Sequence, residues 1–151
     1  MSEATTPRVR EAIPSDASAL APLLGQLGYP VDASVLARRM ERMLARHDEI
    51  ILIAEDAETP PRALGLLALH MFPVLAYDAD AAMIMALVVA EDARGSGVGR
   101  SLVARADEIA RRHGAGRMLV TTHVRRADAH AFYERLGFDF TGRRYVRLLA
   151  D

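Results

Sequence analysis

The chain has 151 residues, of which 51% are hydrophobic and 26% charged, with a formal net charge of -1 and no cysteine. This length and balance fit one globular domain and exclude a disordered chain, and the near-neutral charge argues against nucleic acid or a membrane as partners. The lack of cysteine excludes disulfides, thiolate metal sites and a cysteine nucleophile, and we expect no bound metal.

The first half of the chain predicts a strand, two helices and two further strands. Residues 8–13 are expected to form a strand that ends at Pro14, and the stretch 15–29 predicts a helix with Ser15 as its N-cap. Residues 32–47 predict an amphipathic helix whose methionines fill the core. Two strands, 49–56 and 62–72, follow across a hairpin connection.

The second half begins with an acidic loop and the most apolar run of the chain. Residues 81–90 lack alternation, which is typical of a central strand covered on both faces. A helix over 97–114, a strand over 117–124, a short helix over 127–137 and two closing strands about Gly142 complete the prediction. The order β-α-α-β-β-β-α-β-α-β-β indicates an α/β fold with a mixed sheet, in a single domain over residues 1–151.

Between the apolar strand and its helix, residues 94–100 read RGSGVGR. The spacing fits neither the Walker phosphate loop nor the dinucleotide fingerprint. Two interpretations remain. The glycines make a sharp turn whose helix is capped by Ser96, or they clear side chains away so that an anion can approach the helix N-terminus.

Two motifs resemble those of the GNAT superfamily of acyl-CoA-dependent N-acyltransferases. The first has the pattern Q/R-x-x-G-x-G/A, and the second reads A-x-x-F/L-Y-x-x-x-G-F. The residues that match them are Arg94, Gly97 and Gly99 in the first, and Ala129, Phe132, Tyr133, Gly137 and Phe138 in the second. The resemblance implies a mostly antiparallel, splayed central sheet flanked by helices, with acetyl-CoA as cosubstrate.

The same resemblance assigns roles to residues around the turn. The pyrophosphate of coenzyme A is expected at Arg94, Gly95, Ser96, Gly97, Val98, Gly99 and Arg100. The backbone of the preceding strand, at Leu87, Val88 and Val89, is expected to pair with the pantetheine arm and to stabilise the oxyanion. Tyr133 matches the general acid that protonates the departing thiolate, although packing alone would explain an aromatic residue at this position.

Two positions depart from the family pattern. Met85 stands where many relatives carry a glutamate that accepts the amine proton, and Arg126 stands where an asparagine often opens the second motif. The candidates for the missing base are His70, His123, Glu91 and Asp92. We favour His70, with a water relay and no dedicated base as the alternative.

Acceptor recognition is expected in the loop after the first helix and in the acidic loop. Tyr29, Asp78 and Asp80 are the candidates to attract an ammonium group, unless the acids only aid solubility. The resemblance therefore predicts acetyl transfer to a primary amine of a small molecule, an aminoglycoside-like compound or a peptide. The alternative is a non-catalytic acyl-CoA-binding sensor or regulatory module.

The remaining expectations concern the surroundings of the protein. The first residues lack the apolar segment of a secretory signal, and the longest apolar run has half the length of a membrane span. A cytoplasmic protein is expected, with neither nucleic acid nor membrane as a partner. Homodimers are common in the family, so a homodimer is among the expectations.

Overall fold

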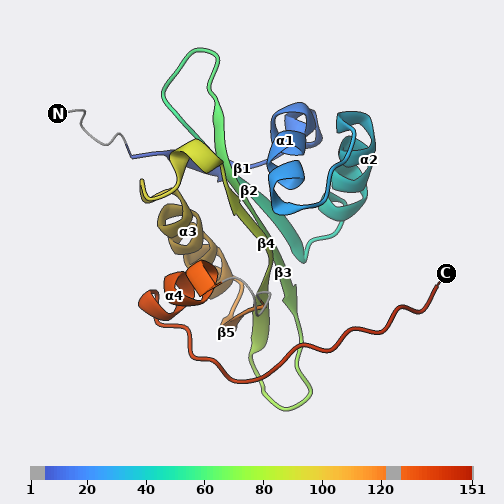
Figure 1. Ribbon diagram of the computed structural model, residues 1–151. Helices are drawn as coiled ribbons and strands as arrows, with labels where there is room; N and C mark the ends of the chain where they lie inside the picture. The colour runs from blue at the N-terminus through green and yellow to red at the C-terminus, as the bar shows by residue number, and fades with distance from the viewer. Residues whose placement is uncertain (1–5, 122–126, 151) are drawn as a thin grey trace. The chain divides into compact units, whose positions relative to one another are not determined.

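The computed structural model describes residues 6–121 and 127–150 of the chain (Figure 1). It contains two compact units, Met1–Leu119 and Val120–Asp151. The elements from the first strand to the last helix follow the predicted order. Among the described helices, none combines the length and apolar character that crossing a membrane requires.

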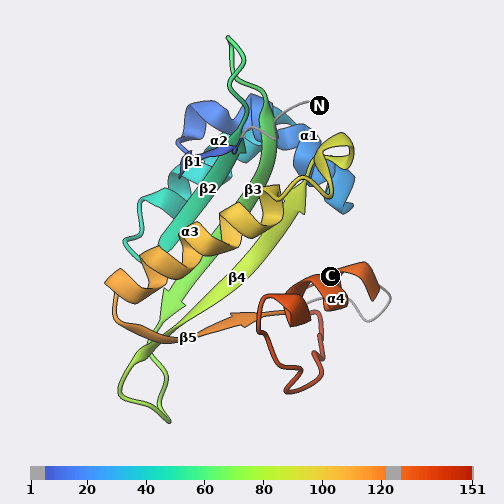
Figure 2. The same ribbon diagram turned by 90° about the vertical axis from the view of Figure 1, so that its left-hand side faces the viewer.

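A five-stranded mixed sheet forms the centre of the first unit. Its strands, in spatial order, are β1 (Arg8–Glu11), β2 (Glu49–Glu55), β3 (Ala63–Phe72), β4 (Asp80–Val89) and β5 (Ala115–Val120). The first three neighbouring pairs are antiparallel. Strand β5 begins beside the start of β4 and then diverges from it (Figure 2). The mixed, mostly antiparallel sheet expected from the sequence is confirmed.

Helices cover both faces of this sheet (Figure 1). Helices α1 (Ala17–Leu27) and α2 (Ala33–Leu44) lie on one face and α3 (Val98–Arg112) on the other. The apolar side chains of α1 and α2 pack on alternate residues of the strands, as a period of two requires. The core on this face includes Leu20, Leu23, Leu36, Met40, Ile51, Ile53, Leu66 and Val88.

The face under α3 is closely packed because one strand residue has no side chain. A Cβ atom at Gly65 would lie 3.0 Å from Cδ1 of Leu102 and 3.1 Å from Cγ1 of Val98. Glycine therefore allows the first turns of α3 to rest directly on β3, which fixes where that helix begins relative to the end of β4.

The second unit holds helix α4 (Ala127–Arg135), followed by Gly137 at a φ of +90°. The prediction of two closing strands after this helix is wrong, because residues 138–150 contain no strand. A strand forms only where a neighbouring strand hydrogen-bonds to it, and residues 138–150 belong to none of the strands of the described sheet. Several of its apolar side chains are exposed, namely Phe140, Tyr145, Val146, Leu148 and Leu149.

The start of the first helix also differs from the prediction. A 3-10 turn, Pro14–Asp16, precedes α1, and Asp16 rather than Ser15 is the N-cap. The carboxylate of Asp16 accepts the amide N–H of Ile13 at 2.8 Å and is held by Arg10. Strand β5 begins two residues earlier than expected, and residues 122–124 of the predicted strand lie outside the described part of the chain.

Candidate active site

The glycine turn between β4 and α3 leaves its backbone uncovered. After the 3-10 turn Glu91–Ala93, Gly95 and Gly97 have φ angles of +80° and +91°, values that residues with a side chain rarely adopt. A Cβ atom at either glycine would meet no atom of the described residues within 4 Å. Backbone conformation, and not crowding within the protein, therefore requires glycine here, and the space above the turn is open.

Helix α3 starts at this turn and presents its first amide groups there. Gly97 is the N-cap, and the first intrahelical bond runs from the Ser101 N–H to the Gly97 oxygen at 3.0 Å. The earlier amides of the helix have no acceptor within it, and its dipole is positive at this end. Ser96 does not cap the helix, because its hydroxyl donates to the carbonyl of Ala93.

Contacts from three directions hold the turn in place. The side-chain oxygen of Gln26 on α1 accepts the amide N–H of Glu91 at 3.0 Å. Arg62, between β2 and β3, pairs with Asp92, and this contact keeps the pKa of that carboxyl below its usual value. The Arg94 side chain turns back toward the Val89 carbonyl at 3.4 Å. Because Asp92 is engaged as an ion-pair partner, it is a poor candidate for the base.

The preceding strand presents backbone groups at its outer edge. The amide of Ala90 donates to the Leu64 oxygen on β3 at 2.7 Å. Backbone groups alternate in direction along an antiparallel strand, so Val88 also bonds toward β3, whereas Leu87 and Val89 face the other way. Of the three residues expected to pair with a pantetheine arm, two therefore turn their amide and carbonyl groups toward that edge.

A β-bulge interrupts β4 at Met85. Ala86 pairs with Ala68 and Ile84 with Leu69, so Met85 is an extra residue without a partner on β3. Its side chain is 56% exposed. The position that departs from the family pattern is thus the position where the strand bends and its regular pairing is broken.

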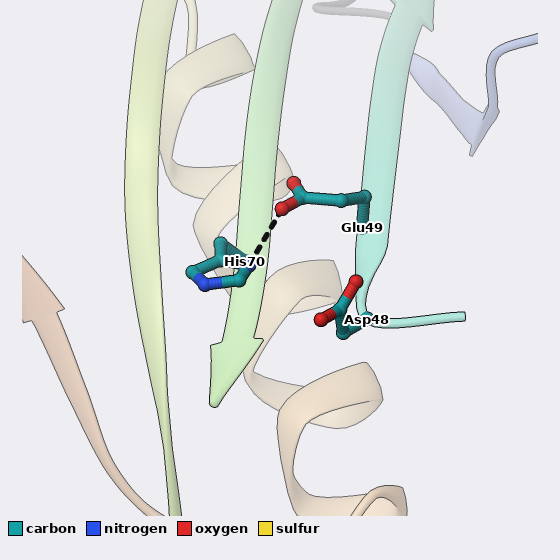
Figure 3. A group of neighbouring side chains, drawn as sticks. All are labelled: Asp48, Glu49 and His70. Carbon is teal, nitrogen blue, oxygen red and sulfur yellow. Dashed lines mark ion pairs between the residues drawn. The ribbon is translucent and has the colours of Figure 1, made fainter. Parts of the chain in front are cut away.

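His70 lies on β3 and faces an acidic neighbour (Figure 3). Its Nδ1 atom is 2.6 Å from Oε1 of Glu49, its pairing partner on β2. The ring also stacks on Phe72, with centroids 5.3 Å apart. His70 pairs with Met83 on β4, which places it near the bulge and away from the glycine turn. Of the other two base candidates, Glu91 lies in the turn itself, and His123 lies outside the described residues.

Tyr133 lies in the second unit, on α4, and is 9% exposed. Its ring makes edge contacts with Phe132 and Phe138, with centroids 5.2 Å and 5.5 Å apart. The backbone supports this arrangement, because the Phe138 amide donates to the Tyr133 oxygen at 3.0 Å. The aromatic residues of the second motif thus form one small cluster around the candidate acid.

The structure does not gather the three acceptor candidates. Tyr29 is 68% exposed and follows the end of α1, the end that contacts the glycine turn through Gln26. Asp78 and Asp80 lie at the opposite end of β4, where the Arg117 guanidinium stacks 3.3 Å from the centre of the Tyr77 ring. At about 3.3 Å per residue, the ten residues of β4 separate these positions by roughly 30 Å. A single small amine therefore cannot contact Tyr29 and the two aspartates at the same time.

Sequence reasoning missed Glu49 and the bulge at Met85. Glu49 follows an acidic residue at the start of a strand, a pattern with no specific meaning of its own. Its proximity to His70 arises from the pairing register between β2 and β3, twenty-one residues apart in the chain. Only a correct register, which the sequence does not specify residue by residue, would have revealed it.

Comparison with known proteins gives a consistent result. The family model described as the acetyltransferase (GNAT) family matches residues 22–138, a span that includes both motifs and residues of both units. The aminoalkylphosphonate N-acetyltransferase of Salmonella typhimurium is 36% identical over 86 residues, or 57% of this chain. That match covers 56% of the relative, so the chain spans little more than half of its length.

Solved structures resemble nearly the whole chain. A transcriptional regulator from Bacillus halodurans C-125 has a TM-score of 0.85 at 25% identity, covering 95% of this chain and 99% of that one. An acetyltransferase from Trypanosoma brucei has a TM-score of 0.81 at 26% identity, with the same coverage of 95% and 99%.

Proposed function

This chain belongs to the GNAT acetyltransferase family, and from that membership we propose that it transfers an acetyl group from acetyl-CoA to a primary amine by direct attack in a ternary complex. The observation that carries the proposal is the open turn at Gly95 and Gly97, directly before the N-terminus of α3. Both the turn and the second motif lie within the residues that match the family.

The turn suits the pyrophosphate of coenzyme A. Phosphate oxygens need hydrogen-bond donors, and the first amides of α3 supply them together with the positive end of the helix dipole. Arg94 and Arg100 add cationic side chains on either side of the glycines. A side chain at Gly97 would enter the open space in which we propose that the pyrophosphate binds.

The outer edge of β4 suits the pantetheine arm. Leu87 and Val89 direct backbone donors and acceptors to this edge, and an arm with two amide groups can pair with them as an added strand would. An amide N–H near the bulge is then available to stabilise the negative charge that develops on the thioester oxygen. This role requires main chain and no particular side chain, which agrees with the wholly apolar sequence of β4.

Two proton transfers complete the reaction. The neutral amine attacks the thioester carbon and must lose one proton as the carbon–nitrogen bond forms, and the departing thiolate must gain one as the carbon–sulfur bond breaks. We assign the second transfer to the Tyr133 hydroxyl, since a phenol remains protonated at neutral pH and is a competent donor to a thiolate. We assign the first to His70, because the bulge position holds a methionine that cannot accept a proton.

The relative from Salmonella suggests the acceptors to test first. Its name states that it acetylates aminoalkylphosphonates, and we propose a small amine that carries an anionic group as the first acceptor class for this chain. Aminoglycosides, polyamines, amino acids and short peptides complete the panel.

The test is the release of free thiol from acetyl-CoA by the purified protein with each amine. A rate with one class of amines supports the proposal and identifies the acceptor. Calorimetry with acetyl-CoA alone is the second measurement. Binding without turnover on any amine would contradict acetyl transfer to amines and support a binding module, and no binding would contradict the assignment of the glycine turn.

A further inference from the structure

Glu49 and His70 form a close pair on the sheet face that carries α1 and α2. They are pairing partners at the first residue of β2 and near the end of β3, and their side chains are 14% and 28% exposed. The carboxylate oxygen Oε1 lies 2.6 Å from the ring nitrogen Nδ1 (Figure 3). Ile51 and Ile53 continue the same face of β2 into the core under the helices.

The surroundings of the ring favour one protonation pattern. Nδ1 is closed off from solvent, and although the approach of Glu49 lies outside ideal hydrogen-bond alignment, the carboxylate is the group that this nitrogen faces. A buried ring nitrogen beside a carboxylate is stabilised as a donor. The neutral ring then carries its proton on Nδ1, and Nε2, which points away from Glu49 (Figure 3), is left as the acceptor.

The ring is also restrained in orientation. Phe72, two residues along the same strand, stacks on it with an angle of 17° between the ring planes. The carboxylate on one side and the aromatic ring on the other limit rotation of the imidazole. A fixed ring keeps Nε2 in one direction, as a group that must meet a reacting amine requires.

The position along the sheet matches the expected site of chemistry. A pantetheine arm spans roughly 17 Å, the reach of about five extended residues. An arm that leaves the glycine turn at Val89 and follows β4 therefore brings its thioester close to Ile84 and the bulge at Met85. His70 lies on the neighbouring strand, β3, and pairs with Met83, which is one residue beyond Ile84.

We propose that Glu49 is a positioning residue for His70, and that the two form a dyad in which Nε2 of His70 accepts the proton lost by the attacking amine. The inference rests on the proposed function and adds to it the residue that orients the base. The proton moves from the amine nitrogen to Nε2 as the carbon–nitrogen bond forms, and the imidazolium is stabilised by the Glu49 carboxylate.

A divalent metal is the competing use of the same residues. One ligand atom each from Asp48, Glu49 and His70 lies within 4.8 Å of the others. Both oxygens of Asp48, however, are engaged by Arg46 at 3.0 Å, which lowers the pKa of the Asp48 carboxyl. Two ligands that are each about 2.1 Å from one ion lie roughly 3 Å apart or more, so a separation of 2.6 Å fits a shared proton better than a shared ion.

The test compares four variants in steady-state acetyl transfer: Glu49→Gln, His70→Gln, the double variant, and Asp48→Asn as the matched control. We expect His70→Gln to lower kcat by about 100-fold or more and Glu49→Gln by about tenfold, with KM for acetyl-CoA unchanged. The double variant should be no slower than His70→Gln, because Glu49 acts only through the ring. Asp48→Asn should stay within about twofold, and thermal unfolding checks that each variant folds.

Several outcomes would overturn the dyad. Additive losses of kcat in the double variant would overturn it, and so would an unchanged kcat in Glu49→Gln. In both cases, acetyl transfer by the wild-type protein would still support the proposed function. A loss in Asp48→Asn equal to that in Glu49→Gln, together with inhibition by a chelator, would favour the metal.

A second measurement does not depend on activity. Long-range proton–nitrogen NMR, with the His70→Gln spectrum for assignment, is expected to show the neutral ring protonated on Nδ1 in the wild-type protein. Protonation on Nε2 would overturn the dyad whatever the activity. A wild-type protein that acetylates no amine would overturn the proposed function and, with it, the catalytic use of the pair.

Discussion

The ring of Tyr133 is held by aromatic neighbours on two sides, Phe132 and Phe138. This cluster accounts for the burial of the residue without any chemical role. These packing contacts are made by the ring, whereas the proposed proton transfer needs the hydroxyl group. Removing that one atom therefore separates the two roles.

We expect Tyr133→Phe to lower kcat by about 100-fold or more, because a general acid contributes rate enhancement of that order. Acetyl-CoA affinity, measured by calorimetry, should be nearly unchanged. Tyr145→Phe, at a position that is 86% exposed, is the control and should keep full activity. Equal turnover of the Tyr133 variant and the wild-type protein would limit this residue to packing.

Local spacing in the sequence was enough to predict the backbone conformation of the glycine turn. Gly95 and Gly97 have the positive φ angles that their place before a helix suggests. Glu49 could not be found in this way, because its meaning depends on the strand that pairs with it. Tyr29, Asp78 and Asp80 were grouped by charge and loop position, and the structure shows that the length of β4 separates them.

At the scale of elements, α3 has a glycine of the same conformation beyond each end. Gly97 at the start and Gly114 after the end have φ angles of +91° and +81°, and in the part of the chain that the structure describes no atom lies within 4 Å of an added Cβ at either position. The two positions carry the same conformational strain for any other residue. Only the first adjoins the free amides of the helix.

This symmetry gives a controlled test of the anion site. We expect Gly97→Val and Gly114→Val to destabilise the protein by similar amounts, about 1–2 kcal/mol each from the left-handed conformation. Acetyl-CoA affinity should fall by about tenfold or more in Gly97→Val alone, as measured by calorimetry. Normal binding by this variant would exclude the turn as the pyrophosphate site.

The start of α1 depends on a charge cluster that the sequence pattern did not indicate. Arg10 on β1 donates two hydrogen bonds to Asp16, at 2.8 Å and 2.9 Å, and another to Glu55 on β2 at 3.0 Å. Glu55 is 4% exposed. The cluster ties the first helix to two strands, which explains why Asp16 and not Ser15 marks where the helix begins.

These contacts predict a pH dependence of stability. The hydrogen bonds from Arg10 hold the pKa of Asp16 below its usual value of 3.8. The stabilisation is therefore fully present above that value and is lost as the pH falls through the lower folded-state pKa. We expect Asp16→Asn to lower the free energy of unfolding by about 1.5–3 kcal/mol at pH 7 and by less in acid.

Urea unfolding of the wild-type protein and of Asp16→Asn, at pH 7 and in acid, measures this difference in the free energy of unfolding. Asp92→Asn, which breaks an exposed ion pair with Arg62, is the control and should lose less. If the difference in free energy of unfolding between Asp16→Asn and the wild-type protein does not change with pH, the stabilising role assigned to the Asp16 carboxylate is contradicted.

At the scale of the whole molecule, the order of elements from Arg8 to Arg135 could be predicted from hydrophobic periodicity and glycine positions. The two closing strands could not, because alternation along residues 138–150 gives a strand only where a partner is available. Whether the two units act as the single domain expected from the sequence stays a prediction. The family match from residue 22 to residue 138 includes residues of both.

The C-terminal segment offers a direct test. Its arginines, Arg143, Arg144 and Arg147, are exposed and lie in no helix or strand. We expect trypsin to cleave at these residues before it cleaves at Arg117, which lies in β5 and stacks on Tyr77. Mass spectrometry of a timed digest shows the order in which these sites are cleaved. Protection of all three C-terminal arginines from trypsin would indicate that the segment is paired in solution, as a dimer would allow.

The bulge at Met85 also bears on how this chain tolerates insertions and deletions. Losing one residue from a strand ordinarily turns every side chain on one side of the gap to the wrong face of the sheet. Met85 is the surplus residue of its pairing, so its removal would leave Ile84 opposite Leu69 and Ala86 opposite Ala68, with each side chain on its present face. A single codon deletion at this site would thus yield a regular strand and an intact core without the bend that the proposed chemistry uses. An ancestral or engineered relative that has lost activity but kept the fold could arise here in one step.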